Sequence, residues 1–223
     1  MSSHDITLKT IRETRLVAIL RGIPMDRVDG VVQALISGGI KVLEFTFDHG
    51  TPEFIKDNAA RISHTLSQYG NRVIVGCGTA LTTEEVAAAH DAGASLAITP
   101  NVNPDVIQCA RKLDMVAMPG AMTPTEIELA WHSGADIVKL FPAGNLGPSY
   151  IKAVRGPLGH IPISAVGGIS LECIPAFLDA GVCGFGIGGP LVLPAAVKSG
   201  DYAAIEAKAK QFTDAVAAWE AGQ

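Results

Sequence analysis

Short apolar runs rich in β-branched residues alternate with Ala-rich amphipathic stretches along almost the whole chain. Eight of the runs predict strands, at residues 16–21, 41–47, 72–77, 95–99, 115–118, 136–141, 161–166 and 184–188. Helices are predicted after them, at residues 26–37, 52–69, 83–92, 104–112, 124–132, 149–154 and 171–180 and from residue 201 onwards. Eight strand–helix units favour a (β/α)8 TIM barrel with a short N-terminal helix, as one domain over residues 1–223. An open doubly wound sheet uses the same units, but no Gly-x-Gly-x-x-Gly follows the first strand.

The composition limits the partners to be expected. Apolar residues make up 48% of the chain and charged residues 17%, which suits a packed α/β core with buried parallel strands. The net charge is −5 and there is no basic block, so neither nucleic acid nor an anionic membrane surface is an expected partner. No apolar run approaches the roughly 20 residues of a membrane span. The first residues do not have the pattern of a secretory signal. We therefore expect a cytoplasmic protein.

The cysteines predict neither a metal site nor a disulfide framework. Cys77, Cys109, Cys173 and Cys183 form no Cys-x-x-Cys pair, and no two histidines have the spacing of zinc ligands. Free thiols are the default for a chain with so large a core in a reducing compartment. No metal or other cofactor is predicted.

Lys139 is the residue with the most distinctive chemistry. It lies in the apolar run of residues 137–142 (IVKLFP), where an ammonium group is costly unless it is paired or loses its proton. A desolvated lysine has a lowered pKa, and its neutral amine is a nucleophile. This indicates an enzyme that forms a Schiff base. A structural ion pair is the alternative explanation of the same residue.

Strand alternation places two further charges beside Lys139. Arg21, Glu44 and Lys139 share the face of their strands that is expected to point into the barrel, near its active end. A buried carboxylate can transfer protons, and an arginine can hold a carboxylate or phosphate with two hydrogen bonds. The alternative is an inert charge network that fills the barrel, although barrels usually fill with aliphatic residues. His49 lies near the same end and is a weaker candidate for substrate contact.

Glycine-rich turns follow several predicted strands. Gly167–Gly168 and Gly188–Gly189 follow the seventh and eighth strands, where barrel enzymes often bind phosphate on backbone N–H groups. Residues 76–79 (GCGT) end the third strand, and there the glycines permit close approach of a ligand and Thr79 offers a hydroxyl group. Pro100 lies in a rigid turn after the fourth strand. Each of these turns, taken alone, is also compatible with simple chain reversal.

Six motifs lie in order at the expected strand ends: LEFT at 43–46, GCGT at 76–79, TPN at 99–101, PG at 119–120, VKLFP at 138–142 and VGGI at 166–169. Together they resemble the class I aldolases that act on 2-keto-3-deoxy-6-phosphogluconate (KDPG) and 4-hydroxy-2-ketoglutarate (KHG). The resemblance extends from about residue 16 to residue 219. The segments ILRGI at 19–23 and GPSYIK at 147–152 look most like the 6-phosphogalactonate branch of that family.

The resemblance implies a Schiff-base aldehyde-lyase that releases pyruvate and an aldehyde, such as glyceraldehyde 3-phosphate or glyoxylate, from a small 2-keto acid. It implies that Lys139 forms the Schiff base and that Glu44 is the general acid/base. The implied substrate contacts are Arg21, Thr79, Pro100 and Phe141, with Gly167, Gly168, Gly188 and Gly189 near the phosphate. It further implies a cytoplasmic homotrimer that needs no metal.

The chain departs from that family pattern at two places. Many relatives carry an arginine shortly after the strand-two glutamate, where this chain has Asp48–His49, and many have a serine where this chain has Pro190. Both departures concern the far end of the substrate rather than the chemistry at Lys139. Two other functions stay open: a sugar-phosphate isomerase or epimerase on the same barrel, and a non-catalytic sugar-acid binding protein.

Overall fold

The strands form one parallel sheet that closes through a strand interrupted by proline. A computed structural model describes residues 2–222. Its strands are β1 (Leu16–Leu20), β2 (Val42–Thr46), β3 (Ile74–Gly78), β4 (Leu96–Ile98), β5 (Val116–Met118), β6 (Gly120–Ala121), β7 (Val138–Leu140), β8 (Ile163–Val166) and β9 (Gly184–Ile187). Their order is β5-β4-β3-β2-β1-β9-β8-β7-β6. Only Pro119 separates β5, which pairs with β4, from β6, which pairs with β7. Proline has no N–H for the ladder, so the fifth barrel strand is split there. The predicted (β/α)8 barrel is confirmed.

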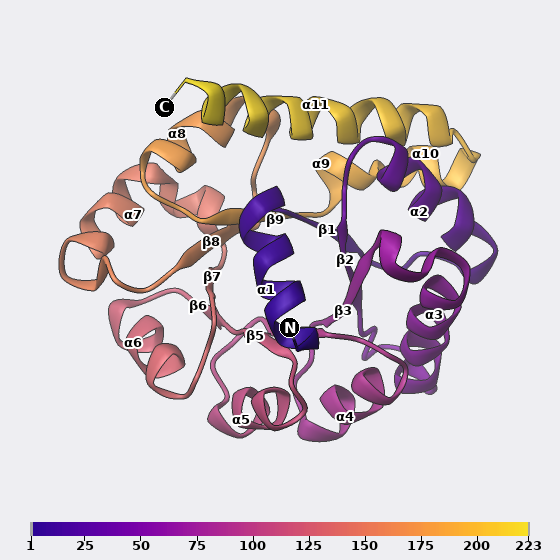
Figure 1. Ribbon diagram of the computed structural model, residues 1–223, viewed down its shortest axis with the longest axis horizontal. Helices are drawn as coiled ribbons and strands as arrows, with labels where there is room; N and C mark the ends of the chain where they lie inside the picture. Colours follow the sequence, from indigo (N-terminus) through magenta and orange to yellow (C-terminus); the bar gives the residue numbers. More distant parts are fainter. Residues whose placement is uncertain (1, 223) are drawn as a thin grey trace.

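Helices surround this barrel on its outside (Figure 1). They are α1 (Ser3–Thr14), α2 (Val28–Ser37), α3 (Phe54–Tyr69), α4 (Thr83–Asp91), α5 (Pro104–Lys112), α6 (Pro124–His132), α7 (Ala143–Leu158), α8 (Ile174–Asp179), α9 (Gly189–Val192), α10 (Pro194–Ser199) and α11 (Tyr202–Ala221). Short 3-10 turns lie at Met25–Arg27, Gly70–Arg72 and Leu171–Cys173. Helix starts follow the sequence signals: the hydroxyls of Thr82 and Thr123 accept hydrogen bonds from the backbone N–H groups of Glu85 and Glu126.

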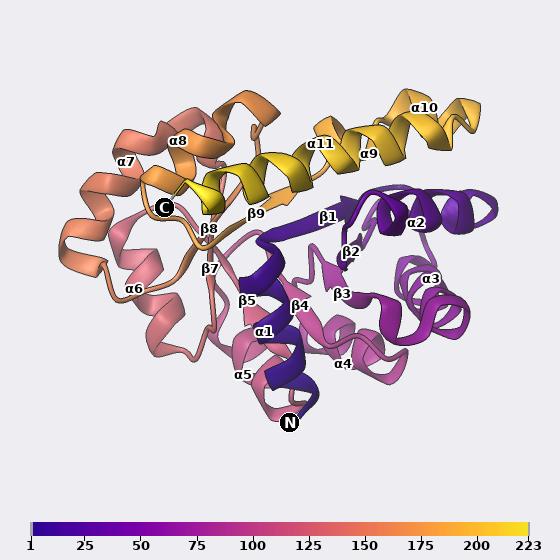
Figure 2. The same ribbon diagram turned by 45° about the horizontal axis from the view of Figure 1, so that its top comes forward.

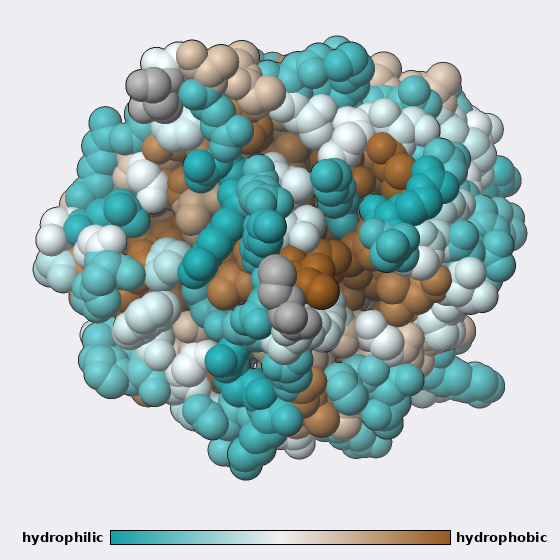
Figure 3. Space-filling view, viewed as in Figure 1, coloured by the Kyte–Doolittle hydropathy of each residue, from teal (hydrophilic) through white to brown (hydrophobic). Residues whose placement is uncertain are grey.

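Helix α1 covers the N-terminal end of the barrel. Ile11 packs in one buried cluster with Val17, Val42 and Leu96, which lie in β1, β2 and β4. The hydroxyl of Thr7 donates to that of Ser95 at 2.8 Å, and His4 contacts Asp136 at 2.9 Å. Figure 3 shows a hydrophilic outer surface along this helix, with apolar side chains beside it. Because α1 covers one end, a ligand enters the lumen from the carboxyl ends of the strands.

The C-terminal part of the chain contains helices that the sequence patterns did not predict. After β9 the chain forms α9 and α10, and α11 then runs back along α2, α8 and α9 (Figure 2). Helix α7 begins at Ala143, six residues before the predicted start, and contains a break at Gly147, whose φ is 75°. Glycine alone adopts such a φ readily, so α7 consists of a short first turn and a longer second part.

Candidate active site

All ten of the predicted site residues line one cavity of about 420 Å³ at the carboxyl ends of the strands. They are Arg21, Glu44, Thr79, Pro100, Lys139, Phe141, Gly167, Gly168, Gly188 and Gly189. The sequence analysis did not identify the apolar part of the wall, which includes Ile19, Val166 and Ile187. These three lie within or at the ends of predicted strands. Ile19 and Val166 follow the same alternation that positioned Glu44 and Lys139, whereas Ile187 is in register with Ala18 and has the opposite alternation.

Glu44 and Lys139 are the two buried charged side chains of this cavity. Glu44, in the middle of β2, is 2% exposed, and Lys139, in the middle of β7, is 6% exposed. The sheet holds Glu44 in register with Ile19 of β1 and Gly76 of β3. Gly78 completes the local fit, because a Cβ atom there would overlap the Glu44 carboxyl group. A missing methyl group on β3 therefore provides the space for this carboxyl group.

The surroundings of Lys139 favour a neutral amine. Burial lowers the pKa of this lysine, and the nearby positive charge of Arg21 lowers it further, whereas the negative charge of Glu44 opposes the change. The Nζ atom lies 5.3 Å from the centre of the Phe141 ring. Desolvation is the largest of these effects, so the amine loses its proton more readily than an ordinary lysine and becomes a nucleophile.

Glu44 is shifted in the opposite direction. Burial raises the pKa of its carboxyl group, and the positive charges of Lys139 and Arg21 reduce that rise. No ion pair within 4.0 Å joins Glu44 to Lys139 in the part of the chain that the structure describes. Their influence on each other is charge acting at a distance. This geometry does not match the alternative of a structural ion pair. It provides one amine and one carboxyl group whose uncharged forms are both favoured by burial.

Arg21 lies at the mouth of the cavity, near the active end of the barrel where it was predicted. Strand β1 ends at Leu20, and the arginine that follows is exposed there. The chain turns at Gly22, whose φ is 62°, so strand alternation no longer sets the direction of neighbouring side chains. The side chain still lines the cavity. Its exposure allows it to meet an anionic group of an entering ligand.

The backbone conformations of Thr79 and Gly167 restrict which residues can occupy these two turns. Thr79 has a φ of 59°, a left-handed conformation that is uncommon for a threonine and is often found at functional sites. Gly167 has a φ of 86°, and a Cβ atom on it would lie 3.0 Å from the Phe141 ring. In contrast, a Cβ atom on Gly189 would meet nothing within 4 Å. The space beside Gly189 is open, which leaves backbone accessible to a ligand.

The residues at the two departures from the family pattern differ in whether they line the cavity. His49 contacts Glu85 at 3.0 Å through Nε2, its ring packs on Phe54, and it does not line the cavity. Asp48 accepts a hydrogen bond from the backbone N–H of Gly50 at 3.2 Å and likewise lies outside the cavity wall. Pro190 does line the cavity. The β2 side of the site therefore offers no cation, and the β9 loop offers no hydroxyl group at residue 190.

Replacing Gly78 with alanine tests whether the position of Glu44 matters. The new methyl group would displace the Glu44 carboxyl group, because the two cannot occupy the same space. We expect Gly78→Ala to lower kcat by about tenfold to a hundredfold, within the range that positioned proton transfer contributes. The measurement is steady-state release of pyruvate. Gly156→Ala is a matched control, because a Cβ atom there meets nothing within 4 Å. Equal rates for Gly78→Ala and the unmodified protein would contradict the assigned geometry.

A family model described as "Aldolase: KDPG and KHG aldolase" matches residues 7–208. This chain belongs to the KDPG and KHG aldolase family. It is 39% identical over 183 residues to the probable 2-dehydro-3-deoxy-6-phosphogalactonate aldolase of Rhizobium meliloti (strain 1021), covering 82% of this chain and 84% of the relative. It is 36% identical over 177 residues to the 2-dehydro-3-deoxy-6-phosphogalactonate aldolase of Escherichia coli (strain K12), covering 79% and 83%.

A solved structure agrees with this membership. The structure described as "Native KDPGal structure" has a TM-score of 0.81 and 33% sequence identity, over 92% of this chain and 95% of that chain. The predicted family is therefore confirmed, and so is the predicted activity of an aldolase. Within residues 2–222, no helix of this aldolase is long and apolar enough to cross a membrane.

Proposed function

We propose that this aldolase cleaves 2-dehydro-3-deoxy-6-phosphogalactonate to pyruvate and glyceraldehyde 3-phosphate, with Lys139 as the nucleophile and Glu44 as the general acid/base. The assignment of these two residues rests on their burial in one cavity, where the pKa of Lys139 is lowered and the pKa of Glu44 is raised. The choice of the galactonate substrate is supported by the names of the two relatives at 39% and 36% identity.

Lys139 begins the reaction. Its neutral amine attacks the C2 ketone of the substrate, and loss of water gives a cationic imine. This imine accepts the electron pair of the C3–C4 bond when that bond breaks. The aldehyde then leaves, and the three carbons that stay on Lys139 form the enamine of pyruvate. Burial of the amine favours the first step, because it increases the fraction of the nucleophilic, uncharged form.

Glu44 moves the protons. As a carboxylate it accepts the proton of the C4 hydroxyl group, directly or through a water molecule, while the C3–C4 bond breaks. As a carboxylic acid it returns a proton to C3 of the enamine, which regenerates an imine that water hydrolyses. One group alternates between the two forms, and a pKa raised by burial makes the protonated form more accessible than in an ordinary glutamate.

The remaining predicted residues position the substrate. Arg21 and Thr79 are proposed to hold the keto-acid carboxylate, since one supplies a cation and the other a hydroxyl group at the cavity. Pro100 and Phe141 form walls beside the reacting carbons. Backbone N–H groups near Gly167–Gly168 and Gly188–Gly189 are proposed to lie near the phosphate, as in other barrels that bind phosphate after the last strands.

A panel of keto acids tests the substrate assignment. The galactonate and gluconate substrates are epimers at C4 and release the same products, so one coupled assay for pyruvate measures both. We expect kcat/KM to be at least about tenfold higher for the galactonate epimer, which corresponds to about 1.4 kcal/mol of differential transition-state binding. 4-Hydroxy-2-ketoglutarate serves as the third substrate. Preference for the gluconate epimer or for 4-hydroxy-2-ketoglutarate would contradict the assignment while leaving the Schiff-base chemistry intact.

We also propose, from the family resemblance, that the aldolase is a cytoplasmic homotrimer. Light scattering of the purified protein would then give a particle with three times the mass of one chain.

A further inference from the structure

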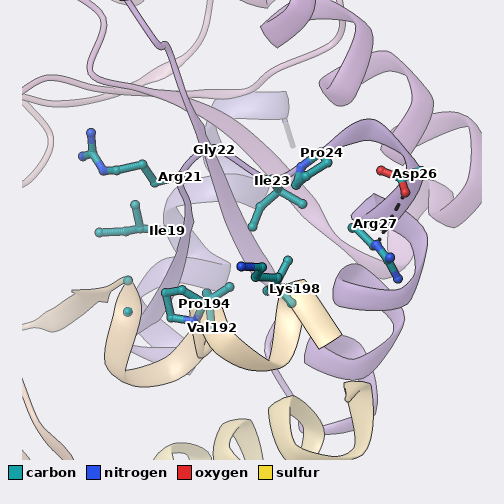
Figure 4. A pocket seen from close by; sticks show the side chains of 13 residues that line it. Ile19, Arg21, Gly22, Ile23, Pro24, Asp26, Arg27, Val192, Pro194 and Lys198 are labelled. Atoms are coloured by element: carbon teal, nitrogen blue, oxygen red, sulfur yellow. Dashed lines mark ion pairs between the residues drawn. The ribbon is translucent and has the colours of Figure 1, made fainter. Parts of the chain in front are cut away.

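A second cavity of about 680 Å³ adjoins the active site (Figure 4). Ile19, Arg21, Gly188 and Gly189 line both cavities, so the two share a boundary. This boundary is formed by the end of β1 and by the turn after β9. A ligand anchored at Lys139 can therefore extend past this boundary without leaving the protein surface.

The walls of the second cavity come from two segments that are far apart in the sequence. One wall is the loop that follows β1, including Ile23 and Pro24, and the other is formed by α9 and α10, including Val192 and Val197. Lys198 projects from α10 into the cavity between these walls, and Arg21 lies apart from it, beside Ile19 (Figure 4). Apolar walls with a cation at each side are suited to an elongated ligand with an anionic end.

The charges of this cavity are unevenly compensated. Arg27 is paired with Asp26 at 3.4 Å, so its charge is largely offset. No carboxylate of residues 2–222 forms an ion pair with Lys198 or with Arg21 within 4.0 Å. Lys198 is exposed, and its amine is free to meet a ligand. The second cavity therefore carries an uncompensated positive charge close to the active site.

The opposite side of the active site lacks such a charge. The loop after β2 carries Asp48 and His49, which lie outside the cavity wall, and His49 is engaged with Glu85. Pro190 supplies neither a hydroxyl group nor a backbone N–H. An anionic group at the far end of the substrate therefore has a cation available on the α10 side and none on the β2 side.

We propose, on the basis of the function proposed above, that the phosphate at the far end of the substrate lies at the boundary between the two cavities and that Lys198, in the second cavity, is its cation. Gly188 and Gly189 lie on the shared boundary. The phosphate lies beside them, on the side that faces α10. Lys198 is a specificity-determining residue in this arrangement. It contacts the phosphate and takes no part in the chemistry at Lys139.

Lys198→Met separates this role from the chemistry. The variant is assayed with 2-keto-3-deoxygalactonate in its 6-phosphorylated and unphosphorylated forms. We expect KM for the phosphorylated form to rise about tenfold, the loss of one charge-assisted contact at an exposed site, and kcat/KM for the unphosphorylated form to stay unchanged. The preference for phosphate therefore falls about tenfold. Unchanged turnover of the unphosphorylated form also shows that the variant folds.

Two further variants complete the experiment. Lys41→Met removes an exposed lysine before β2, at the other end of the barrel, and should leave the preference unchanged. Lys198→Arg keeps the charge and should retain most of the preference. An unchanged preference in Lys198→Met would overturn the proposal. So would a loss of inhibition by free inorganic phosphate without a change in preference, because the cavity would then bind a separate anion.

This test is distinct from the test of the proposed function. If the unmodified protein forms no adduct with pyruvate and borohydride, the function itself is wrong. If it forms the adduct and Lys198→Met has the same phosphate preference as the unmodified protein, only the role of the second cavity is wrong.

Discussion

Lys139→Met is expected to lose aldol cleavage almost completely, with kcat/KM lower by about 10⁵-fold or more, the scale of loss when an enzyme's nucleophile is removed. Methionine has a similar length and apolar character but no amine, so no imine forms and the C3–C4 bond has no electron acceptor. The measurement is release of pyruvate from the galactonate substrate. Activity above about 1% of the unmodified level would contradict the role of Lys139, because no other lysine of residues 2–222 lines this cavity.

The same variant separates catalysis from stability. Lys139 is 6% exposed, and burial lowers its pKa, which means that its charged form is disfavoured in the folded protein. Replacing it with an apolar side chain of similar size should leave the melting temperature equal or raise it. A structural ion pair would give the reverse, since loss of one partner leaves a buried charge uncompensated. A clear fall in melting temperature would therefore support the structural explanation of this residue.

Glu44→Gln is expected to give an enzyme that forms the imine but turns over slowly. Glutamine keeps the size and polarity of the side chain and cannot exchange a proton, so kcat should fall by about 10²–10⁴-fold. Trapping with pyruvate and borohydride should still label Lys139. A variant that neither turns over nor forms the adduct would show that Glu44 is required before bond cleavage, which contradicts its assigned step.

The pH profile gives this prediction a second readout. Bond cleavage needs the ionised form of Glu44, whose pKa is raised by burial. In the unmodified enzyme kcat should therefore fall with decreasing pH at a higher pH than an ordinary glutamate would give. Glu44→Gln has no such carboxyl group, and its residual rate should lack this fall. The apparent value belongs to the coupled Glu44–Lys139 pair rather than to one residue.

The pairing of Glu44 with Lys139 could be predicted because both lie inside strands. Alternation along β2 and β7 determines which side chains face the lumen, and both residues are at central strand positions. Arg21 was predicted by the same rule and is exposed at the mouth, because β1 ends before it. Alternation therefore placed all three residues at the cavity, and only the exposure of Arg21 depended on where β1 ends.

The second cavity could not be predicted from local sequence patterns. Helices α9 and α10 are four and six residues long, too short to show a helical period. Leu193, with a φ of 53°, separates them, and each has a proline in its first turn. The position of Lys198 depends on how these turns follow β9 and pack against the β1 loop. Such contacts between distant segments leave no periodic signal in the chain.

The departures at Asp48 and Pro190 have a related explanation. Sequence comparison within the resemblance showed which groups were missing, but not which residue could replace them. In the folded protein Lys198 is 154 positions away from Glu44 along the chain, and the two lie around adjoining cavities. The sequence therefore indicated the chemistry at the reacting carbons and left the far end of the substrate open.

Borohydride reduction in the presence of pyruvate tests the central claim most directly. The unmodified aldolase is incubated with pyruvate and borohydride, digested, and analysed by mass spectrometry. We expect a reduced pyruvate adduct on the peptide that contains Lys139, dependent on pyruvate and absent from Lys139→Met. No adduct, or an adduct on a different lysine, would contradict the assignment of Lys139 as the residue that forms the Schiff base.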